Sequence, residues 1–146
     1  MAIVVGVDGS EGAKAALRWA IEEARLRHAT VDAVYAWPFP YGAAGFGWAP
    51  TFDQDFLDEM RRAAESALSA CVSDVTGGRE DVEVTQRAIE GAPAEVLLER
   101  AEGADLLVVG SRGHGGFKEL VLGSVGHQCA LHAPCPVVIV RPPGRG

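Results

Sequence analysis

The amino-acid sequence predicts an α/β protein in which helices cover both faces of one parallel sheet. Apolar runs of strand length, most of them without polar alternation, are typical of strands that are buried on both faces. Segments with helical periodicity separate these runs, and the connections between them are short. The length of 146 residues suits a single domain over 1–146, with a loose tail at 142–146.

The first part of the chain is expected to form two strands, a helix and a long loop. The run "AIVVGVD" at 2–8 predicts the first strand, and Ser10 after it is a suitable N-cap for a helix. A second strand is expected at 30–37, and the proline, glycine and aromatic residues at 38–50 predict a loop. The apolar residues at helical spacing between the two strands are Ala13, Ala16, Leu17, Ala20, Ile21 and Ala24.

A longer helix is expected to begin at about Thr51 and to carry an apolar stripe on one side. The segment 81–89 alternates and is rich in β-branched residues, which predicts a third strand near an edge of the sheet. The residues of the expected stripe are Phe56, Met60, Ala63, Ala64, Ala67 and Cys71.

The last part of the chain is expected to add two helices and two strands. A short helix is predicted over 92–102, where Pro93 is tolerated in the first turn. The apolar run at 104–110 predicts a fourth, buried strand. A helix over 124–131 and a fifth strand over 135–141 complete the alternating order.

The composition argues against nucleic acid and membranes as partners. The formal net charge is −7 and the basic residues form no cluster, whereas duplex nucleic acid and anionic membranes need concentrated positive charge. The opening "MAIVVGVDGS" does not resemble a signal peptide, and no stretch approaches the ~20 apolar residues of a membrane span. Cys71, Cys129 and Cys135 are an odd number of thiols in a chain too large to need disulfides. A cytoplasmic protein with reduced cysteines is therefore expected.

The segment "GSRGHGGFKELVLGSVG" at 110–126 carries six glycines directly after the apolar run "ADLLVV". Such a density predicts either a tight turn or the close approach of a ligand to the backbone. Several known phosphate loops are excluded. Lys118 is followed by Glu119 rather than by serine or threonine, and neither G-x-G-x-x-G nor G-x-S-x-G is present.

Gly110, Gly113 and the pair Gly123-Ser124 are separated by two and nine residues. The first two glycines would let the backbone turn off a strand and present N–H groups. The pair would open the last helix, whose exposed N–H groups and dipole favour an anion. Each hydrogen bond to a charged oxygen contributes roughly 1.5–3 kcal/mol, so a few of them could hold an anion on an acidic protein. The alternative is a connection that binds no ligand.

This spacing, G-x2-G-x9-G-[ST], resembles the nucleotide-binding signature of the ATP-binding universal stress proteins, and the match is complete. "IVVGVDGSEGAKAALRWA" is similar to the opening strand and helix of that family, and "HAPCPVVIVR" is similar to its closing segment. The resemblance extends over nearly the whole length. It implies a five-stranded, Rossmann-like sheet in the order 3-2-1-4-5, bound ATP, often with Mg²⁺, a homodimer, and a role in stress adaptation.

Carried over to this sequence, the resemblance implies a nucleotide site at the carboxyl ends of the first, second and fourth strands. Asp8 would accept hydrogen bonds from the ribose hydroxyls, and the backbone of Ala36 would read the adenine edge. The glycine signature would bind the ribose and the phosphates. Gly126 stands where the family often has a second hydroxyl residue, which removes a possible phosphate contact. The expected site residues are Val7, Asp8, Ala36, Gly110, Arg112, Gly113, Gly123, Ser124 and Val125.

Several residues also have a simpler structural explanation. Asp8 could be a helix-capping carboxylate, and Arg112 could be a solvated cation of the loop. Cys129, His132 and Cys135 have the spacing C-x2-H-x2-C, but no fourth ligand is evident, so no metal site is expected. The aromatic residues of the long loop could cover a nucleotide or pack on the core. They are Trp37, Phe39, Tyr41, Phe46 and Trp48.

The last strand, with "PVVIV" at 136–140, is wholly apolar and would lie at an edge of the sheet. Pairing with the same strand of a second copy would cover it, although the flanking prolines and Arg141 could protect it instead. The sequence thus predicts an ATP-binding regulatory protein that acts as a homodimer. One alternative is a slow ATPase or nucleotidyl transferase, for which Ser111 and Ser124 have no predictable base. Another is a dimeric interaction module that binds no nucleotide.

Overall fold

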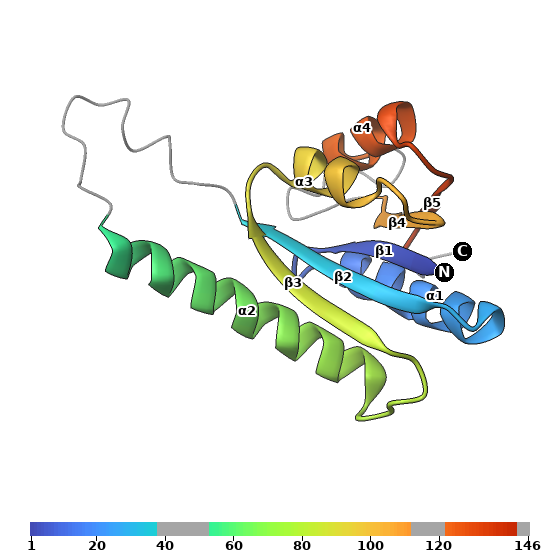
Figure 1. Cartoon of the computed structure of the whole chain (residues 1–146), viewed down its shortest axis with the longest axis horizontal. Helices are drawn as coiled ribbons and strands as arrows, with labels where there is room; N and C mark the ends of the chain where they lie inside the picture. Colours follow the sequence, from blue (N-terminus) through green and yellow to red (C-terminus); the bar gives the residue numbers. More distant parts are fainter. Residues whose placement is uncertain (38–52, 112–121, 143–146) are drawn as a thin grey trace.

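Five parallel strands form one sheet in the order β3-β2-β1-β4-β5, which confirms the predicted α/β fold and the expected strand order (Figure 1). The computed structural model describes residues 1–37, 53–111 and 122–142. The strands are β1 (Ala2–Val7), β2 (Thr30–Trp37), β3 (Val84–Glu90), β4 (Leu106–Gly110) and β5 (Val137–Val140). The helices are α1 (Glu11–Arg27), α2 (Gln54–Thr76), α3 (Pro93–Arg100) and α4 (Ser124–His132). None of the helices within the described ranges combines the length and the apolar character that a membrane span needs.

The helices lie in two layers, with α1 and α2 on one face of the sheet and α3 and α4 on the other (Figure 1). The central strand β1 contributes side chains to both layers. Ile3 and Val5 pack in the cluster that α1 and α2 cover, whereas Val4 packs in the cluster that α3 and α4 cover. This burial on two sides explains why the strand is a continuous apolar run.

Side-chain caps set the first residues of α1 and α2. Ser10 is the N-cap of α1, as predicted, and its Oγ accepts a hydrogen bond of 3.2 Å from the amide of Ala13. The predicted start of α2 near Thr51 is wrong, because the helix begins directly after Asp53. The Asp53 carboxylate accepts a hydrogen bond of 3.0 Å from the amide of Phe56. A cap of this kind stabilises a helix by about 1 kcal/mol, so it determines where the helix begins.

Of the stripe predicted for α2, only Ala64 and Cys71 are buried. Phe56 is 39% exposed and Ala63 is exposed as well. With 23 residues α2 is about 35 Å long, whereas the 8 residues of β2 span only about 26 Å. Figure 1 shows the first turns of α2 extending past the carboxyl ends of β2 and β3, so these turns lie beyond the sheet. The buried residues are Ala64, Leu68, Cys71 and Val72.

The start of β3 is also corrected, from 81 to Val84, where the strand first pairs with Val31 of β2. The residues before it belong to the connection from α2. There, Asp81 Oδ2 accepts hydrogen bonds from Arg25 Nε at 2.5 Å and from Arg79 Nη2 at 3.3 Å. The bond from Arg25 lowers the pKa of Asp81 and holds this connection against α1. The boundaries of the other predicted elements agree with the structure to within two residues.

Close packing of α3 on β1 depends on Gly6. A Cβ atom added to Gly6 would lie 2.8 Å from Cδ1 of Leu97, and the Leu97 side chain is only 3% exposed. The absence of a side chain on Gly6 therefore lets α3 approach the sheet.

We expect Gly6→Ala to destabilise the protein by about 1–3 kcal/mol, because its methyl group overpacks against Leu97. Leu97→Ala should cost about 2–5 kcal/mol through the cavity that it leaves. In the double variant the new methyl group fills part of that cavity, so the combined loss should be smaller than the sum of the two. Urea unfolding of the four proteins, followed by circular dichroism, measures these free energies. If the losses in unfolding free energy were strictly additive, Gly6→Ala would not overpack against Leu97.

Candidate functional site

The sheet opens at the carboxyl ends of β1 and β4. Pairing between these two strands ends at Val5 and Val108, and the described residues form no further pair beyond them. On the outer sides the pairing continues, because β1 stays paired with β2 as far as Val7, and β4 stays paired with β5 as far as Gly110. Strand order reverses between β1 and β4, and open α/β sheets bind ligands at such a point.

Asp8 follows β1 at this opening and is part of the cap of α1. Its Oδ1 accepts hydrogen bonds from the amide of Ser10, at 2.9 Å, and from the Ser10 hydroxyl. Gly9 between them has a φ of 82°, a left-handed conformation that glycine adopts without strain. Asp8 therefore positions Ser10, the N-cap residue of α1. The same carboxylate is half-buried and lies at the carboxyl end of β1.

The other side of the opening is formed by the N-terminus of α4. The amide of Gly123 donates a hydrogen bond of 2.7 Å to the carbonyl of Ser111, and the Ser111 amide donates to the carbonyl of Val140 at 2.9 Å. No described side chain caps α4. The first amides of a helix have no acceptor within the helix, so those of Ser124 and Val125 form the positive end of the helix dipole. This end lies next to the carboxyl end of β4.

Gly126 has a packing role in the first turn of α4. It is buried, and a Cβ atom added to it would lie 2.8 Å from Cδ1 of Leu122 and 3.6 Å from the carbonyl oxygen of Gly110. A hydroxyl residue at this position would have to displace the Leu122 side chain. The absence of a side chain on Gly126 therefore leaves room for the Leu122 side chain beside the first turn of α4.

Ala36 lies in the part of β2 that extends beyond β1. The last pair between β1 and β2 joins Val7 to Tyr35, so Ala36 and Trp37 are paired on the β3 side only. Trp37 is 6% exposed, and its Nε1 has no hydrogen-bond partner among the residues that the structure describes. Among the described residues, the backbone of Ala36 and Trp37 thus has no strand neighbour on the β1 side.

Seven of the nine predicted site residues fall in the described part of the chain, all of them at the carboxyl edge of the sheet. Arg112 and Gly113 lie outside the described residues, as do most of the aromatic residues of the long loop. One contact at the site, the hydrogen bond from the Gly123 amide to the carbonyl of Ser111, is not predicted by the sequence. Because every residue has a backbone carbonyl, the pattern of residue types does not predict which carbonyl accepts this hydrogen bond.

The C-x2-H-x2-C segment spans the end of α4 and the start of β5. Cys129 is fully buried, and burial raises the pKa of its thiol to about 11. Cys135 is half-buried, which raises its pKa as well, and His132 is exposed. Within the described parts of the chain, no three His, Cys, Asp or Glu side chains come together as a metal site. All three cysteines are free thiols.

A parallel sheet with this strand order, open at its switch point and flanked there by a helix N-terminus, defines a Rossmann-like α/β protein. The model described as "Universal stress protein family" matches residues 1–141. The chain therefore belongs to the universal stress protein family.

Curated relatives support this membership. Universal stress protein Rv2623 of Mycobacterium tuberculosis is 33% identical over 139 residues, which cover 95% of this chain but only 44% of that protein. A universal stress protein of Thermus aquaticus is 36% identical over 143 residues, which cover 95% of this chain and 97% of the relative. The chain thus spans less than half the length of the mycobacterial relative and nearly all of the Thermus one.

Solved structures of universal stress proteins share the fold. UspA from Lactobacillus plantarum has a TM-score of 0.78 at 22% identity, over 97% of both chains. A universal stress protein in complex with cAMP has a TM-score of 0.62 at 27% identity, also over 97% of both chains. A universal stress protein from Archaeoglobus fulgidus in complex with dAMP has a TM-score of 0.56 at 27% identity, over 95% of this chain and 96% of the other.

We expect the three cysteines of the native protein to react with iodoacetamide at different rates. Cys135 should be modified first, because Cys71 and Cys129 are buried and desolvation disfavours their thiolates. Peptide mass spectrometry after timed alkylation at pH 8 measures the order, and alkylation in urea provides the unfolded reference. Modification of Cys129 as fast as Cys135 in the native protein would contradict the burial of Cys129.

Proposed function

We propose that the chain binds ATP, together with Mg²⁺, at the carboxyl ends of β1, β2 and β4, and that it acts as a regulatory protein in stress adaptation. The observation that carries this proposal is the position of the α4 N-terminus. The bond from the Gly123 amide to the Ser111 carbonyl holds the first turn of α4 beside the end of β4. Amides at a helix N-terminus are suitable donors for phosphate oxygens.

The residues around the opening suit the other parts of a mononucleotide. The Asp8 carboxylate, on the β1 side, would accept hydrogen bonds from the ribose hydroxyls. The backbone of Ala36, in the part of β2 beyond β1, would bind the adenine edge. Gly110 leaves the end of β4 without a side chain, so the ribose and phosphates could approach the backbone.

Two relatives support an adenine nucleotide as the ligand. The universal stress proteins bound to cAMP and to dAMP are each 27% identical to this chain and share its fold. Both ligands consist of adenine, a pentose and one phosphate group. Extending this to ATP is our proposal, and it rests on the complete G-x2-G-x9-G-[ST] signature of the sequence.

The proposed site is consistent with the acidic character of the chain. A net charge of −7 repels a free triphosphate at long range. Backbone amides act through fixed dipoles at short range and need no basic side chain. Mg²⁺ bound to the triphosphate would reduce the repulsion further, which is why we include the metal with the nucleotide.

Calorimetry of the nucleotide-free protein with Mg·ATP is expected to show saturable binding in the micromolar range. Gly123→Asp should weaken this binding at least about tenfold, because it puts a negative charge at the helix end that faces the phosphates. Gly123→Asn is the matched control, with the same shape and no charge. The backbone of Gly123, with φ of −65° and ψ of 163°, accepts either residue as an N-cap, so both variants should fold.

Mass spectrometry of the denatured protein should first establish that no nucleotide was retained during purification. The absence of binding at millimolar Mg·ATP would refute the nucleotide proposal. Equal affinities of the Gly123→Asp and Gly123→Asn variants would refute the placement of the phosphates at α4.

We further propose that β5 pairs in antiparallel fashion with β5 of a second copy. β5 is at the edge of the sheet, and its four residues are half-buried. The carbonyl of Pro136 accepts a hydrogen bond from Leu107 of β4, and the carbonyl of Val140 accepts one from Ser111, directly after β4. Since backbone groups alternate in direction along a strand, those of Val137 and Ile139 point to the open edge.

Ile139→Pro should convert a dimer into a monomer, because it removes an edge N–H without removing a donor to β4. Ile139→Ala is the control, since it loses a similar amount of side-chain packing but keeps the N–H. Light scattering after size-exclusion chromatography measures the mass, and circular dichroism checks the fold. A monomeric wild-type protein, or a dimeric Ile139→Pro variant, would exclude this interface.

A further inference from the structure

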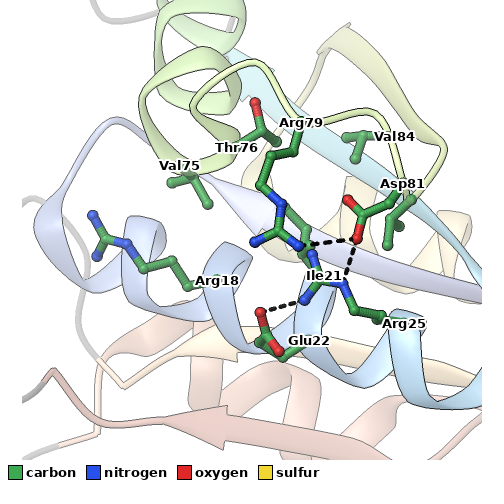
Figure 2. A pocket seen from close by; sticks show the side chains of 10 residues that line it. Arg18, Ile21, Glu22, Arg25, Val75, Thr76, Arg79, Asp81 and Val84 are labelled. Atoms are coloured by element: carbon green, nitrogen blue, oxygen red, sulfur yellow. Dashed lines mark hydrogen bonds and ion pairs between the residues drawn. The ribbon is translucent and has the colours of Figure 1, made fainter.

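A pocket lies at the opposite end of the sheet from the proposed nucleotide site. It is formed by α1, the end of α2 and the connection into β3, and it has a volume of about 240 Å³ (Figure 2). Val84, at the start of β3, lines it and pairs with Val31 near the start of β2, so the pocket is at the amino ends of the strands. None of the residues that line it belongs to the proposed nucleotide site.

The base of this pocket is apolar. Ile21 of α1 and Val82 of the connection are 6% and 8% exposed. Val75 and Val84 are half-buried beside them. Apolar side chains from three different segments therefore provide a surface on which the hydrocarbon part of a ligand can be buried.

Three arginines surround the apolar base, and two of them share one carboxylate. Arg25 and Arg79 both donate to Asp81 Oδ2, and Arg25 also binds Glu22. Figure 2 shows these two guanidinium groups converging on Asp81. Arg18 lies nearer the start of α1, and its guanidinium group is directed away from the other two. Asp81 thus fixes the position of Arg79 at one end of the pocket.

Two of the three guanidinium groups have donors that could bind a further anion. Arg79 makes one side-chain hydrogen bond to the described residues and is 66% exposed, whereas an arginine has five N–H donors. Arg18 is exposed, and no hydrogen bond joins its side chain to another described residue. Its charge contributes less than Lys14 to lowering the pKa of Asp74, so its side chain can turn over the pocket at little cost. The nearby end of α2 does not compete for these donors, because the Ser73 and Thr76 carbonyls accept from backbone amides.

We propose that this pocket binds a small monocarboxylate with an apolar body, such as an arylacetate. Its carboxylate would lie between Arg18 and Arg79, and its hydrocarbon part would lie on Ile21 and the valines. Three arginines and two carboxylates line the pocket, which leaves one unbalanced positive charge and so favours a monoanion. The volume of about 240 Å³ equals that of about eight water molecules at roughly 30 Å³ each, which suits a small ligand such as phenylacetate.

This inference is independent of the proposed nucleotide function. The two sites are at opposite ends of the strands, and they bind an anion by different means. The nucleotide site would use backbone amides, whereas this pocket uses guanidinium groups.

Titration of the full chain with phenylacetate, followed by methyl NMR, tests the proposal. The methyl signals of Ile21 and Val84 are expected to shift saturably, with a dissociation constant of about 1 mM, while those of Val125 stay unchanged. Phenethylamine, which has a similar body and a positive charge, should cause no saturable shift. Acetate, which has the charge without the body, should bind more weakly than phenylacetate.

Arg18→Gln should weaken phenylacetate binding about tenfold, because it removes one of the two guanidinium groups that would contact the carboxylate. Arg61→Gln on α2 is the matched control, since Arg61 pairs with Asp58 and does not line the pocket. The proposal is wrong if phenylacetate gives no saturable shift up to about 20 mM, where a 1 mM site would be filled. It is also wrong if the amine binds equally well, or if Arg18→Gln binds as tightly as the Arg61→Gln control.

Discussion

The burial of β1 on both faces is the constraint on which the rest of the structure depends. Ile3, Val4 and Val5 are at most 2% exposed, so β1 needs a layer of helices on each face. It is paired in parallel with β2 on one side and with β4 on the other. Parallel neighbours in a sheet are joined by crossover connections, and nearly all such connections are right-handed. Crossovers that lead to opposite sides of β1 therefore place their helices on opposite faces of the sheet. The two layers and the reversal of strand order therefore follow from one strand.

The same arrangement creates the candidate site. β1 and β4 separate after Val5 and Val108, since the chain leaves β1 toward one layer and leaves β4 toward the other. Asp8 and the α4 N-terminus then lie on the two sides of the opening. A site composed mainly of backbone amides and one carboxylate does not require a basic surface. This explains how a protein with a net charge of −7 can present a suitable place for an anionic ligand.

Two glycines outside the turns allow close packing for different reasons. Gly6 allows α3 to pack on β1, because an added Cβ would meet the buried Leu97 at 2.8 Å. Gly126, in the first turn of α4, leaves room for the side chain of Leu122, which an added Cβ would meet at 2.8 Å. In the sequence, Gly126 is notable only because the family often has a hydroxyl residue at this position. The structure shows a steric reason for a glycine, since the helix turn, the preceding loop residue and the end of β4 meet there.

The sequence by itself determined the order of the elements, the cap at Ser10 and the glycine signature at the end of β4. These features depend on residues a few positions apart, so periodicity and cap chemistry reveal them. The strand order was implied by the family resemblance, because no local pattern specifies which strands are neighbours. Only the tertiary structure decided where β3 begins, which turns of α2 are buried and which arginines meet at Asp81. Each of these depends on contacts between distant segments, as between Arg25 and Asp81, which are 56 positions apart. Such contacts exist only after the helices have packed on the sheet.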